Sequence, residues 1–410
     1  MHRYSVAIKR IEEPGGSPLK WTSCQLDRLK SDLNNLMMLA VNNAYDFRGR
    51  SVYLHPNLVR PSATRPASFT DPRLILACVD YFLDMGARRV EIGEKPGFGY
   101  PSRAAFREAG LTHHLEQRGV TIHYLDEEEW ITRDNPSGRL YRKIHAARSV
   151  LDADYLVNLP KMKTHMLTMV SLCVKNLLGM IHDNDRQIYH RNDIADKIVD
   201  LLFIRPPDMN IIDGLWPMEG QAPFNGDAIP GFNVLVAGHD APAVDAAACL
   251  IMGISPIEVP HVQLACQRHL SEWIGPDSLH FTGDPLVDVQ RAFKRPVLSS
   301  MAQFQGVECI ECGVCSGCLS AIRHSLDWLR AEGILDSVPE VTIVSGRPMP
   351  NRQTLETWNG RLILFGNCAA EFQFFDTERR QNFIWIPGCA PHVLDLANRL
   401  KMLISGIHSE

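Results

Sequence analysis

Cysteine residues stand three positions apart in one short run of this 410-residue chain. The run is CIECGVCSGC, and its thiols belong to Cys309, Cys312, Cys315 and Cys318. Thiolates at this spacing can converge on one metal centre, and a C-x2-C-x2-C run is typical of a loop that wraps an iron–sulfur cube. We therefore predict that these four cysteines bind a [4Fe-4S] cluster.

The spacing within the run leaves a second metal open. In bacterial ferredoxins the fourth cysteine follows after three residues and precedes proline. Here it follows after two residues and precedes Leu319. Four cysteines also satisfy a tetrahedral zinc site, although zinc modules usually bring two C-x2-C knuckles from separate turns. Zinc is therefore the alternative cofactor, and free thiols or a regulatory disulfide are the remaining alternative.

Two further cysteines, Cys368 and Cys389, each directly follow a predicted apolar strand. If both strands are parallel, both thiols lie at the carboxyl edge of a sheet, where such folds bind ligands. The metal site is therefore predicted to include Cys368 and Cys389 as well, and one of them could replace Cys318 as a ligand. In the alternative interpretation both are small core residues. The other cysteines stand singly and are expected to fill core positions: Cys24, Cys78, Cys173, Cys249 and Cys266.

The densest group of polar side chains lies in the segment 158–180, NLPKMKTHMLTMVSLCVKNLLGM. Its candidate residues are Lys161, Lys163, His165, Lys175 and Asn176. Burying lysines in such apolar surroundings costs several kcal/mol unless an anion or acid pairs with them. The segment therefore predicts a site for the acid group of a small anionic substrate. The alternative is a structural network in which a lysine bonds strand-end carbonyl groups.

Histidines and strand-end polar residues complete the predicted site. The predicted catalytic residues are His165, His190 and Lys163, because a histidine can exchange protons near neutral pH. The predicted substrate-binding residues are Lys161, Lys175, Asn176, His55 and Glu219. In a parallel sheet, residues that end or follow different strands meet at one edge. For His190 a surface histidine, or one with satisfied hydrogen bonds, remains the alternative.

Alternating apolar strands and helices must position these side chains. One such helix is predicted over 71–86, with proline in its first turn and glycine at its end. The alternation predicts an α/β fold with a mostly parallel sheet and helices on both faces, plus a smaller C-terminal α/β unit that carries the cysteines. A region rich in proline and polar residues at 255–305 suggests a linker. We expect a large domain at 1–300 and a cluster-binding domain at 301–410.

Composition excludes several classes of function. The net charge is −5, so no global basic field points to nucleic acid. No run of about 18 apolar residues predicts a membrane span, and the start, MHRYSVAIKR, lacks an apolar signal segment. Eleven cysteines in such a chain fit a reducing compartment, where thiols bind metal rather than pair. We therefore expect a cytoplasmic protein.

The large predicted domain resembles a known family, the bacterial and archaeal "domain of unknown function" family numbered 362. The similarity lies in YLVNLPKMKTHMLTMVSLCVKNLLGMI, where Asp154 is the leading acid before P-K-x-K-T-H and K-N-x-x-G. IIDGLWPMEGQAPFNG and VLVAGHDAPAVDAAACLIMGISP resemble its second and third blocks, so the resemblance covers roughly residues 50–260.

Members of this family often carry ferredoxin-like cluster motifs, so the resemblance implies an iron–sulfur-associated, redox role. The cysteine run departs from the ferredoxin pattern, because no Cys-Pro closes it. A more distant likeness is to the lactate-racemase-like nickel-pincer proteins, in which a strand-end histidine precedes a K-x-x-x-G segment. No nickel cofactor is inferred from that likeness.

These features predict an iron–sulfur oxidoreductase that acts on a small anionic organic substrate, with its [4Fe-4S] cluster near a lysine–histidine crevice. A ferredoxin- or flavodoxin-type protein is the expected electron donor, and a homodimer is compatible with the sequence. One alternative is a non-catalytic metal- or ligand-binding protein with a structural cluster or zinc. Another is a lyase or dehydratase in which an open iron of the cluster acts as a Lewis acid.

Overall fold

The chain forms two compact units, a large unit within residues 1–186 and 194–297 and a smaller C-terminal unit within residues 187–193 and 298–410. The computed structural model describes residues 4–12, 19–41, 45–59, 61, 66–97, 100–187, 194–223, 225–271, 278–296, 304, 306–347, 361–374 and 383–406.

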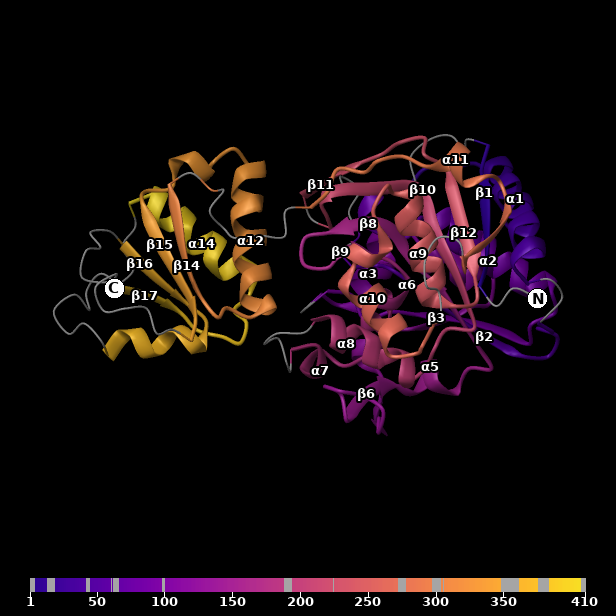
Figure 1. Ribbon diagram of the computed structural model, residues 1–410, viewed down its shortest axis with the longest axis horizontal. Coiled ribbons are helices and arrows are strands. Elements are labelled where there is room, and N and C mark those ends of the chain that lie inside the picture. The colour runs from indigo at the N-terminus through magenta and orange to yellow at the C-terminus, as the bar shows by residue number, and fades with distance from the viewer. Residues whose placement is uncertain are drawn as a thin grey trace. The chain divides into compact units, whose positions relative to one another are not determined.

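A twisted, mixed sheet forms the centre of the large unit (Figure 1), with the strand order β13-β1-β12-β10-β7-β2-β3-β4. Only β12 runs antiparallel to its neighbours along this path, which confirms the mostly parallel sheet predicted from the sequence. The strands of this path are β1 (Ser5–Arg10), β2 (Ser51–Pro56), β3 (Arg89–Gly93), β4 (Thr121–His123), β7 (Tyr155–Leu159), β10 (Met209–Gln221), β12 (Val234–Gly238) and β13 (His280–Gly283).

Shorter strands extend this sheet beside β10. The added strands are β8 (Lys161–His165), β9 (Met169–Ser171) and β11 (Asn225–Ala228). A separate antiparallel ribbon pairs β5 (Trp130–Asp134) with β6 (Lys143–Ala147).

Helices cover both faces of the sheet, as the alternation of strands and helices predicts. Side chains alternate along a strand, so Val52 and Leu54 of β2 lie in the core of one face while Tyr53 lies in the core of the other. The first face is covered by α1 (Ser23–Val41), α2 (Pro72–Asp84), α3 (Ser102–Glu108) and α4 (Thr112–Gln117). The second face is covered by α5 (Arg148–Asp152), α6 (Cys173–Asn176), α8 (Ile194–Asp200), α9 (Ala241–Ile251), α10 (Pro260–Gln267) and α11 (Leu286–Val289).

Helix α2 illustrates how local sequence sets an element that the site depends on. The Asp71 side chain accepts the Arg73 N–H and caps the helix, and Pro72 occupies the first helical position, where a missing N–H costs nothing. Gly86 follows the last turn with a φ of +82°, a conformation that glycine adopts without strain. The helix therefore ends where the sequence predicts, within two residues.

The predicted linker at 255–305 is wrong for the part of it that the structure describes. That part contains α10, β13 and α11, and β13 pairs with β1 at the edge of the large sheet. Val262 and Ala265 of α10 are buried in the core. The prediction failed because a helix this short, opened by Pro260, shows too few apolar repeats to stand out from polar surroundings.

The C-terminal unit is a small parallel α/β layer structure. Its sheet is formed by β14 (Val307–Cys312), β15 (Val341–Gly346), β16 (Arg361–Phe365) and β17 (Phe383–Ile386), paired in chain order. Helices α12 (Ser316–Ala331) and α14 (Val393–Ile404) pack against each other and share one core with the sheet (Figure 1). The short helical segment η8 (Asn367–Phe374) contacts β15 and β16. Because all four strands are parallel, their carboxyl ends meet at one edge.

Candidate functional site: a buried lysine network and a cysteine edge

Two lysines of the segment 158–180 lie on a strand rather than in a loop after one, and the third, Lys175, lies on α6. Lys161, Lys163 and His165 belong to β8, which pairs with β10 so that Lys161 lies opposite Asp213. Residues two apart on a strand point to the same face. The backbone of β8 therefore directs these side chains to one side of the sheet.

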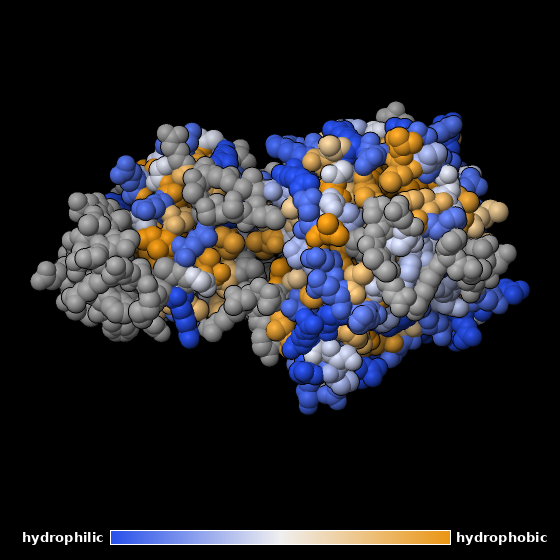
Figure 2. All heavy atoms as spheres, in the orientation of Figure 1, coloured by the Kyte–Doolittle hydropathy of each residue, from blue (hydrophilic) through white to orange (hydrophobic). Residues whose placement is uncertain are grey.

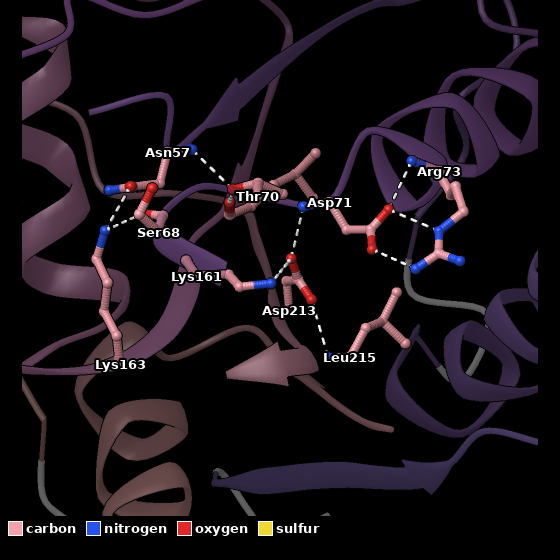
Figure 3. Close-up of polar contacts among 10 residues, drawn as sticks. Asn57, Ser68, Thr70, Asp71, Arg73, Lys161, Lys163, Asp213 and Leu215 are labelled. Atoms are coloured by element: carbon pink, nitrogen blue, oxygen red, sulfur yellow. Dashed lines mark hydrogen bonds and ion pairs between the residues drawn. The ribbon is translucent and has the colours of Figure 1, made fainter. Parts of the chain in front are cut away.

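The ammonium group of Lys161 is paired with a carboxylate of the protein itself. Its Nζ donates to Asp213 Oδ2 at 2.8 Å, and both side chains are 0% exposed (Figure 3). The same carboxylate accepts the backbone N–H groups of Asp71 at 2.6 Å and of Leu215 at 2.9 Å. Because the charge of Lys161 is compensated and the oxygens of Asp213 are shared by several donors, this pair anchors β8 to β10 and to the start of α2.

A second ion pair extends this network toward α2. Arg73 Nη2 donates to Asp71 Oδ2 at 2.7 Å, and both side chains are 0% exposed (Figure 3). Desolvation would lower the pKa of the Arg73 guanidinium, yet the hydrogen bond and charge of Asp71 raise it. The two ion pairs are joined by the Asp71 N–H, so the strand end and the helix start are fixed together.

Lys163 is likewise held by protein atoms. Its Nζ donates to Asn57 Oδ1 at 2.8 Å and to the Ser68 carbonyl at 2.7 Å (Figure 3). Burial, followed by the nearby charge of Lys175, lowers the pKa of the Lys163 ammonium well below its usual value. This carbonyl contact is structural, as the alternative to substrate binding supposed, but Ser68 belongs to the short helical segment η1 (Pro66–Ser68) and not to a strand end.

The amide side chains beside Lys163 form a closed hydrogen-bond network. Asn57 Nδ2 donates to Asn176 Oδ1 at 2.8 Å, and Asn176 Nδ2 donates to Asn158 Oδ1 at 2.8 Å. The ring nitrogens of His55 contact the carbonyl oxygens of Asn176 at 3.0 Å and of Gly93 at 3.1 Å, and burial lowers the pKa of His55 to about 4. Asn176 and His55 therefore tie α6 to the ends of β2 and β3.

Lys175 differs from the other two lysines. No residue that the structure describes forms a hydrogen bond or ion pair with its ammonium group. Burial and the nearby Arg186 lower the pKa of Lys175 to about 8, while Glu94 opposes that shift. In turn, burial raises the pKa of Glu94 to about 7, although Leu58 N–H donates to it and Arg186 and Lys163 attract its charge. The ammonium group of Lys175 therefore lies near the buried carboxyl group of Glu94 and has no partner among the described residues.

The helix that carries Lys175 is positioned by an acid that sequence reasoning passed over. Asp245 of α9 is 0% exposed and accepts the N–H groups of Cys173 at 2.6 Å and Val174 at 3.0 Å. Those are the first N–H groups of α6, which a helix leaves without internal partners. Burial raises the pKa of Asp245 to about 7. Asp245 therefore fixes α6, and with it Lys175.

His261 of α10 is a second residue that the sequence did not single out. It is 0% exposed, and neither ring nitrogen has a hydrogen-bond partner within the described part of the chain. Burial, with the charge of Lys175, lowers the pKa of His261 to about 3. Its only sequence signal was a histidine beside apolar residues in the region assigned to a linker, so nothing connected it to Lys175.

Two other predicted site residues, His165 and Glu219, contact residues other than Lys175. Nδ1 of His165 accepts the Leu167 N–H at 3.1 Å. Glu219 lies within β10, where its carboxylate accepts the Lys294 N–H at 2.8 Å and lies 3.8 Å from the Arg291 guanidinium. His190 lies outside the residues that the structure describes.

The cysteine run spans a strand, a turn and a helix. Cys309 lies inside β14 and Cys312 ends that strand, whereas Cys315 caps the N-terminus of α12 and Cys318 lies in its first turn. Cys309 contacts the apolar core under the helices, and burial raises the pKa of its thiol to about 12. Cys318 is buried in the same core, and Cys315 packs against it as Cys309 does.

Several cysteines follow strands of the C-terminal sheet on the side of its carboxyl edge, although no three described thiols are close enough to hold one metal ion. A hydrogen bond from the Cys318 thiol, together with backbone N–H groups at the start of α12, lowers the pKa of Cys315 to about 6. Cys318 in turn lies within electrostatic range of Cys389, which follows β17. A Cβ added to Gly366, after β16, would lie 3.1 Å from Cys318 Sγ. Cys368 follows Gly366 by two residues and begins η8.

Two negative findings apply to the described residues. Within them, no group of three or more histidine, cysteine, aspartate or glutamate side chains is arranged to hold a metal ion, and the side chain of Cys312 is outside that search. Within them also, no helix is long and apolar enough to cross a membrane. Figure 2 shows hydrophilic side chains interspersed with hydrophobic ones on the visible face of the large unit.

Comparison with known proteins gives a family match within the large unit. The sequence model of the family described as "Domain of unknown function (DUF362)" matches residues 52–250. A thylakoid-associated protein of Synechocystis sp. is 26% identical over 228 residues, which cover 54% of this chain and 68% of that protein. The family match confirms the resemblance predicted from the sequence, while an iron–sulfur association stays a prediction.

Solved structures give only remote likenesses. A Thermotoga maritima protein aligns over 82% of this chain and 74% of its own, at 13% identity and a TM-score of 0.38. The lactate racemase apoprotein from Thermoanaerobacterium thermosaccharolyticum aligns over 84% of this chain and 69% of its own, at 10% identity and a TM-score of 0.39.

Proposed function

For a chain that belongs over residues 52–250 to the DUF362 family, we propose an iron–sulfur oxidoreductase that acts on a small anionic organic substrate. The observation that carries the proposal is the position of three cysteines after strands of the C-terminal sheet, although the described thiols do not converge on one point. Cys315, Cys368 and Cys389 follow three different strands of one parallel sheet. Ligands of open parallel sheets bind at that edge.

The proposed cluster ligands are Cys315, Cys318, Cys368 and Cys389. Cys315 and Cys318 come from the start of α12, where the Cys318 hydrogen bond and backbone N–H groups lower the pKa of Cys315. The hydrogen bond to Cys315 and burial raise the pKa of Cys318. Glycine at position 366 supports this set, because any side chain there would crowd Cys318 Sγ. Cys312 is a further candidate by its place at the end of β14. Cys309 is left out, because it lies inside β14 and not at the carboxyl end of that strand.

A cluster in this place would supply one-electron transfer, with a ferredoxin- or flavodoxin-type protein as the external donor. The four thiolates of this set leave no iron open, which favours electron transfer over the Lewis-acid chemistry of a dehydratase. Zinc is the competing occupant, because four cysteines also satisfy a tetrahedral zinc site. In that case the C-terminal unit has a structural metal and the protein is a non-catalytic binding protein.

The substrate part of the proposal rests on charge in the large unit. Lys161 and Lys163 are occupied by protein acceptors, whereas Lys175 has an ammonium group without a partner among the described residues. Lys175 is only partly buried, and an unpaired cation in such surroundings favours an anionic ligand, since pairing with an anion offsets the cost of its partial desolvation. We therefore place the acid group of the substrate at Lys175.

Metal analysis of anaerobically purified protein tests the proposal. We expect about four iron and four sulfide per chain and a broad absorption band near 400 nm. Cys318→Ser should lose most of the iron, while Cys24→Ser, at an exposed position of α1, should retain it. Cys309→Ser should also retain it. One zinc per chain without colour, or iron that survives Cys318→Ser unchanged, would refute the proposed cluster.

A further inference from the structure

Two polar side chains of the large unit, Lys175 and His261, have no hydrogen-bond or ion-pair partner among the described residues. Lys175 belongs to α6 and His261 to α10, and both helices pack against α8 and α9. Lys175 is the charged residue whose field acts on His261. The two side chains therefore lie close enough for the charge of Lys175 to act on the His261 ring, although 86 residues separate them along the sequence.

The absence of partners for His261 is costly unless something uses its ring. A buried polar group without a hydrogen bond costs about 1–3 kcal/mol, and His261 is 0% exposed with both ring nitrogens unsatisfied among the described residues. Most buried polar groups in proteins are paired. An imidazole at this position would be satisfied by a ligand that brings a hydrogen-bond acceptor.

The charge around Lys175 indicates the sign of that ligand. Once the Lys161–Asp213 pair is set aside as neutral, Lys175 and Glu94 act on Lys163, while Arg186 and Glu94 act on Lys175. Arg186 also lies 3.6 Å from Asp183, which pairs with Lys95 at 3.1 Å. Four basic groups, of Lys95, Lys163, Lys175 and Arg186, thus face the two carboxyl groups of Glu94 and Asp183. Burial also raises the pKa of Glu94 to about 7, so this carboxyl carries less than a full charge near neutral pH. The excess is positive, and it favours an anion.

We propose that Lys175 and His261 together bind the carboxylate of a small organic acid. The ammonium of Lys175 would donate to one carboxylate oxygen, and the ring N–H of neutral His261 would donate to the carboxylate as well. Two donors of this kind match a carboxylate, whereas a phosphate offers more oxygens than the two side chains can satisfy. The inference deepens the anionic-substrate part of the proposed function and does not depend on the cluster.

Several neighbours prepare the site without contacting the ligand themselves. Asp245 holds the first turn of α6 through the N–H groups of Cys173 and Val174. Gly179 follows α6 in the same segment, and a Cβ there would lie 2.7 Å from His55 Cε1 and 2.8 Å from Glu94 Cγ. The Asp245 hydrogen bonds fix the segment before Lys175, and the close packing of Gly179 on His55 and Glu94 fixes it after Lys175. The backbone that carries Lys175 is therefore already in place when the acid binds.

Thermal unfolding of the full chain with added acetate, malonate or inorganic phosphate tests the inference. A ligand that binds only the folded state raises the melting temperature with increasing concentration. Equal ionic strength from potassium chloride controls for general screening. We expect malonate and acetate to stabilise the parent protein more than phosphate does. If neither acetate nor malonate raises the melting temperature more than chloride does, the inference is overturned. The result of the iron analysis, which tests the proposed cluster, does not depend on this outcome.

Two substitutions with matched controls locate the effect. Lys175→Met should weaken carboxylate binding at least about tenfold, because a charge-assisted hydrogen bond is lost. Lys143→Met, at a position 74% exposed, should leave binding unchanged. His261→Leu should weaken binding while the ligand-free protein becomes no less stable, since the replaced group has no partner to lose. A structural histidine would give the opposite result, with lower stability and unchanged binding.

Chemical labelling of the parent protein gives a readout that needs no variant to fold. Acetic anhydride acylates unprotonated amines, so Lys175, with its pKa lowered to about 8, should react at pH 8 and be protected by malonate. Mass spectrometry of peptides would report Lys175 and Lys143 in the same sample. Protection of both lysines to the same degree, or of neither, would contradict the assignment.

Discussion

Replacing Asp213 by asparagine should strongly destabilise the large unit. The variant keeps the shape of the side chain but removes the negative charge that faces Lys161 Nζ at 2.8 Å, in a site where both partners are 0% exposed. It also places an amide N–H where an oxygen now accepts the backbone N–H of Asp71 or Leu215. Breaking one side of a buried ion pair costs about 3–5 kcal/mol, a large part of the roughly 5–15 kcal/mol that stabilises a typical protein.

Urea unfolding followed by circular dichroism measures this cost, and hydrogen exchange of peptides from β8 and β10 shows where it acts. The matched control is Asp227→Asn, whose partner Lys294 lies at 3.2 Å with both side chains about two-thirds exposed. An exposed pair contributes about 0–1 kcal/mol. The double variant Lys161→Met with Asp213→Asn should cost less than the sum of the single variants, because it leaves no buried charge alone.

Two results would refute this reasoning. If Asp213→Asn costs less than about 1 kcal/mol, as expected for the control, the pair is not the buried anchor of β8. If Lys161→Met and Asp213→Asn are strictly additive, the two groups do not interact. Either result would return Lys161 to the set of cations that are free to bind a substrate.

Two further predictions concern stability. Burial opposes protonation of His123, but hydrogen bonds and charges from Glu128 and Glu91 raise the pKa of its imidazole to about 9. This stabilisation is complete below the unfolded pKa of about 6.5 and is lost as the pH rises toward 9. The unfolding free energies measured at pH 6 and pH 9 should therefore differ less in His123→Asn than in the parent protein. Equal differences in the two proteins would contradict the role given to His123. Gly179→Ala should lower stability by about 1–3 kcal/mol, because the added Cβ would lie 2.7 Å from His55 Cε1, and an unchanged melting temperature would show that this contact relaxes freely.

The fold could be predicted from the sequence because its signals are local. Helix α2 has its cap, its proline and its terminal glycine within one stretch of chain, and the apolar strands of the C-terminal sheet are bounded by glycines. The mostly parallel sheet follows from the alternation of such elements. Helix α10 escaped prediction because its short apolar face is formed by only a few residues, so the region looked like a linker.

The candidate site was harder to predict because its partners are distant in sequence. The rule that buried lysines need an anion was sound, yet the anion beside Lys161 is Asp213, on a strand 52 residues away. Pairing of β8 with β10 decides that contact, and no sequence motif states it. His261 could not be predicted either, because what singles it out is that its buried ring nitrogens have no hydrogen-bond partner among the described residues, and no sequence pattern indicates that.

Anaerobic spectroelectrochemical titration of the purified full chain tests the central claim, that the protein is an iron–sulfur oxidoreductase. The account predicts that the band near 400 nm bleaches on reduction and returns on oxidation, as a one-electron process within about −700 to +450 mV, the range of protein-bound iron–sulfur clusters. A colourless zinc protein, or a cluster without a reversible potential in that range, would contradict it.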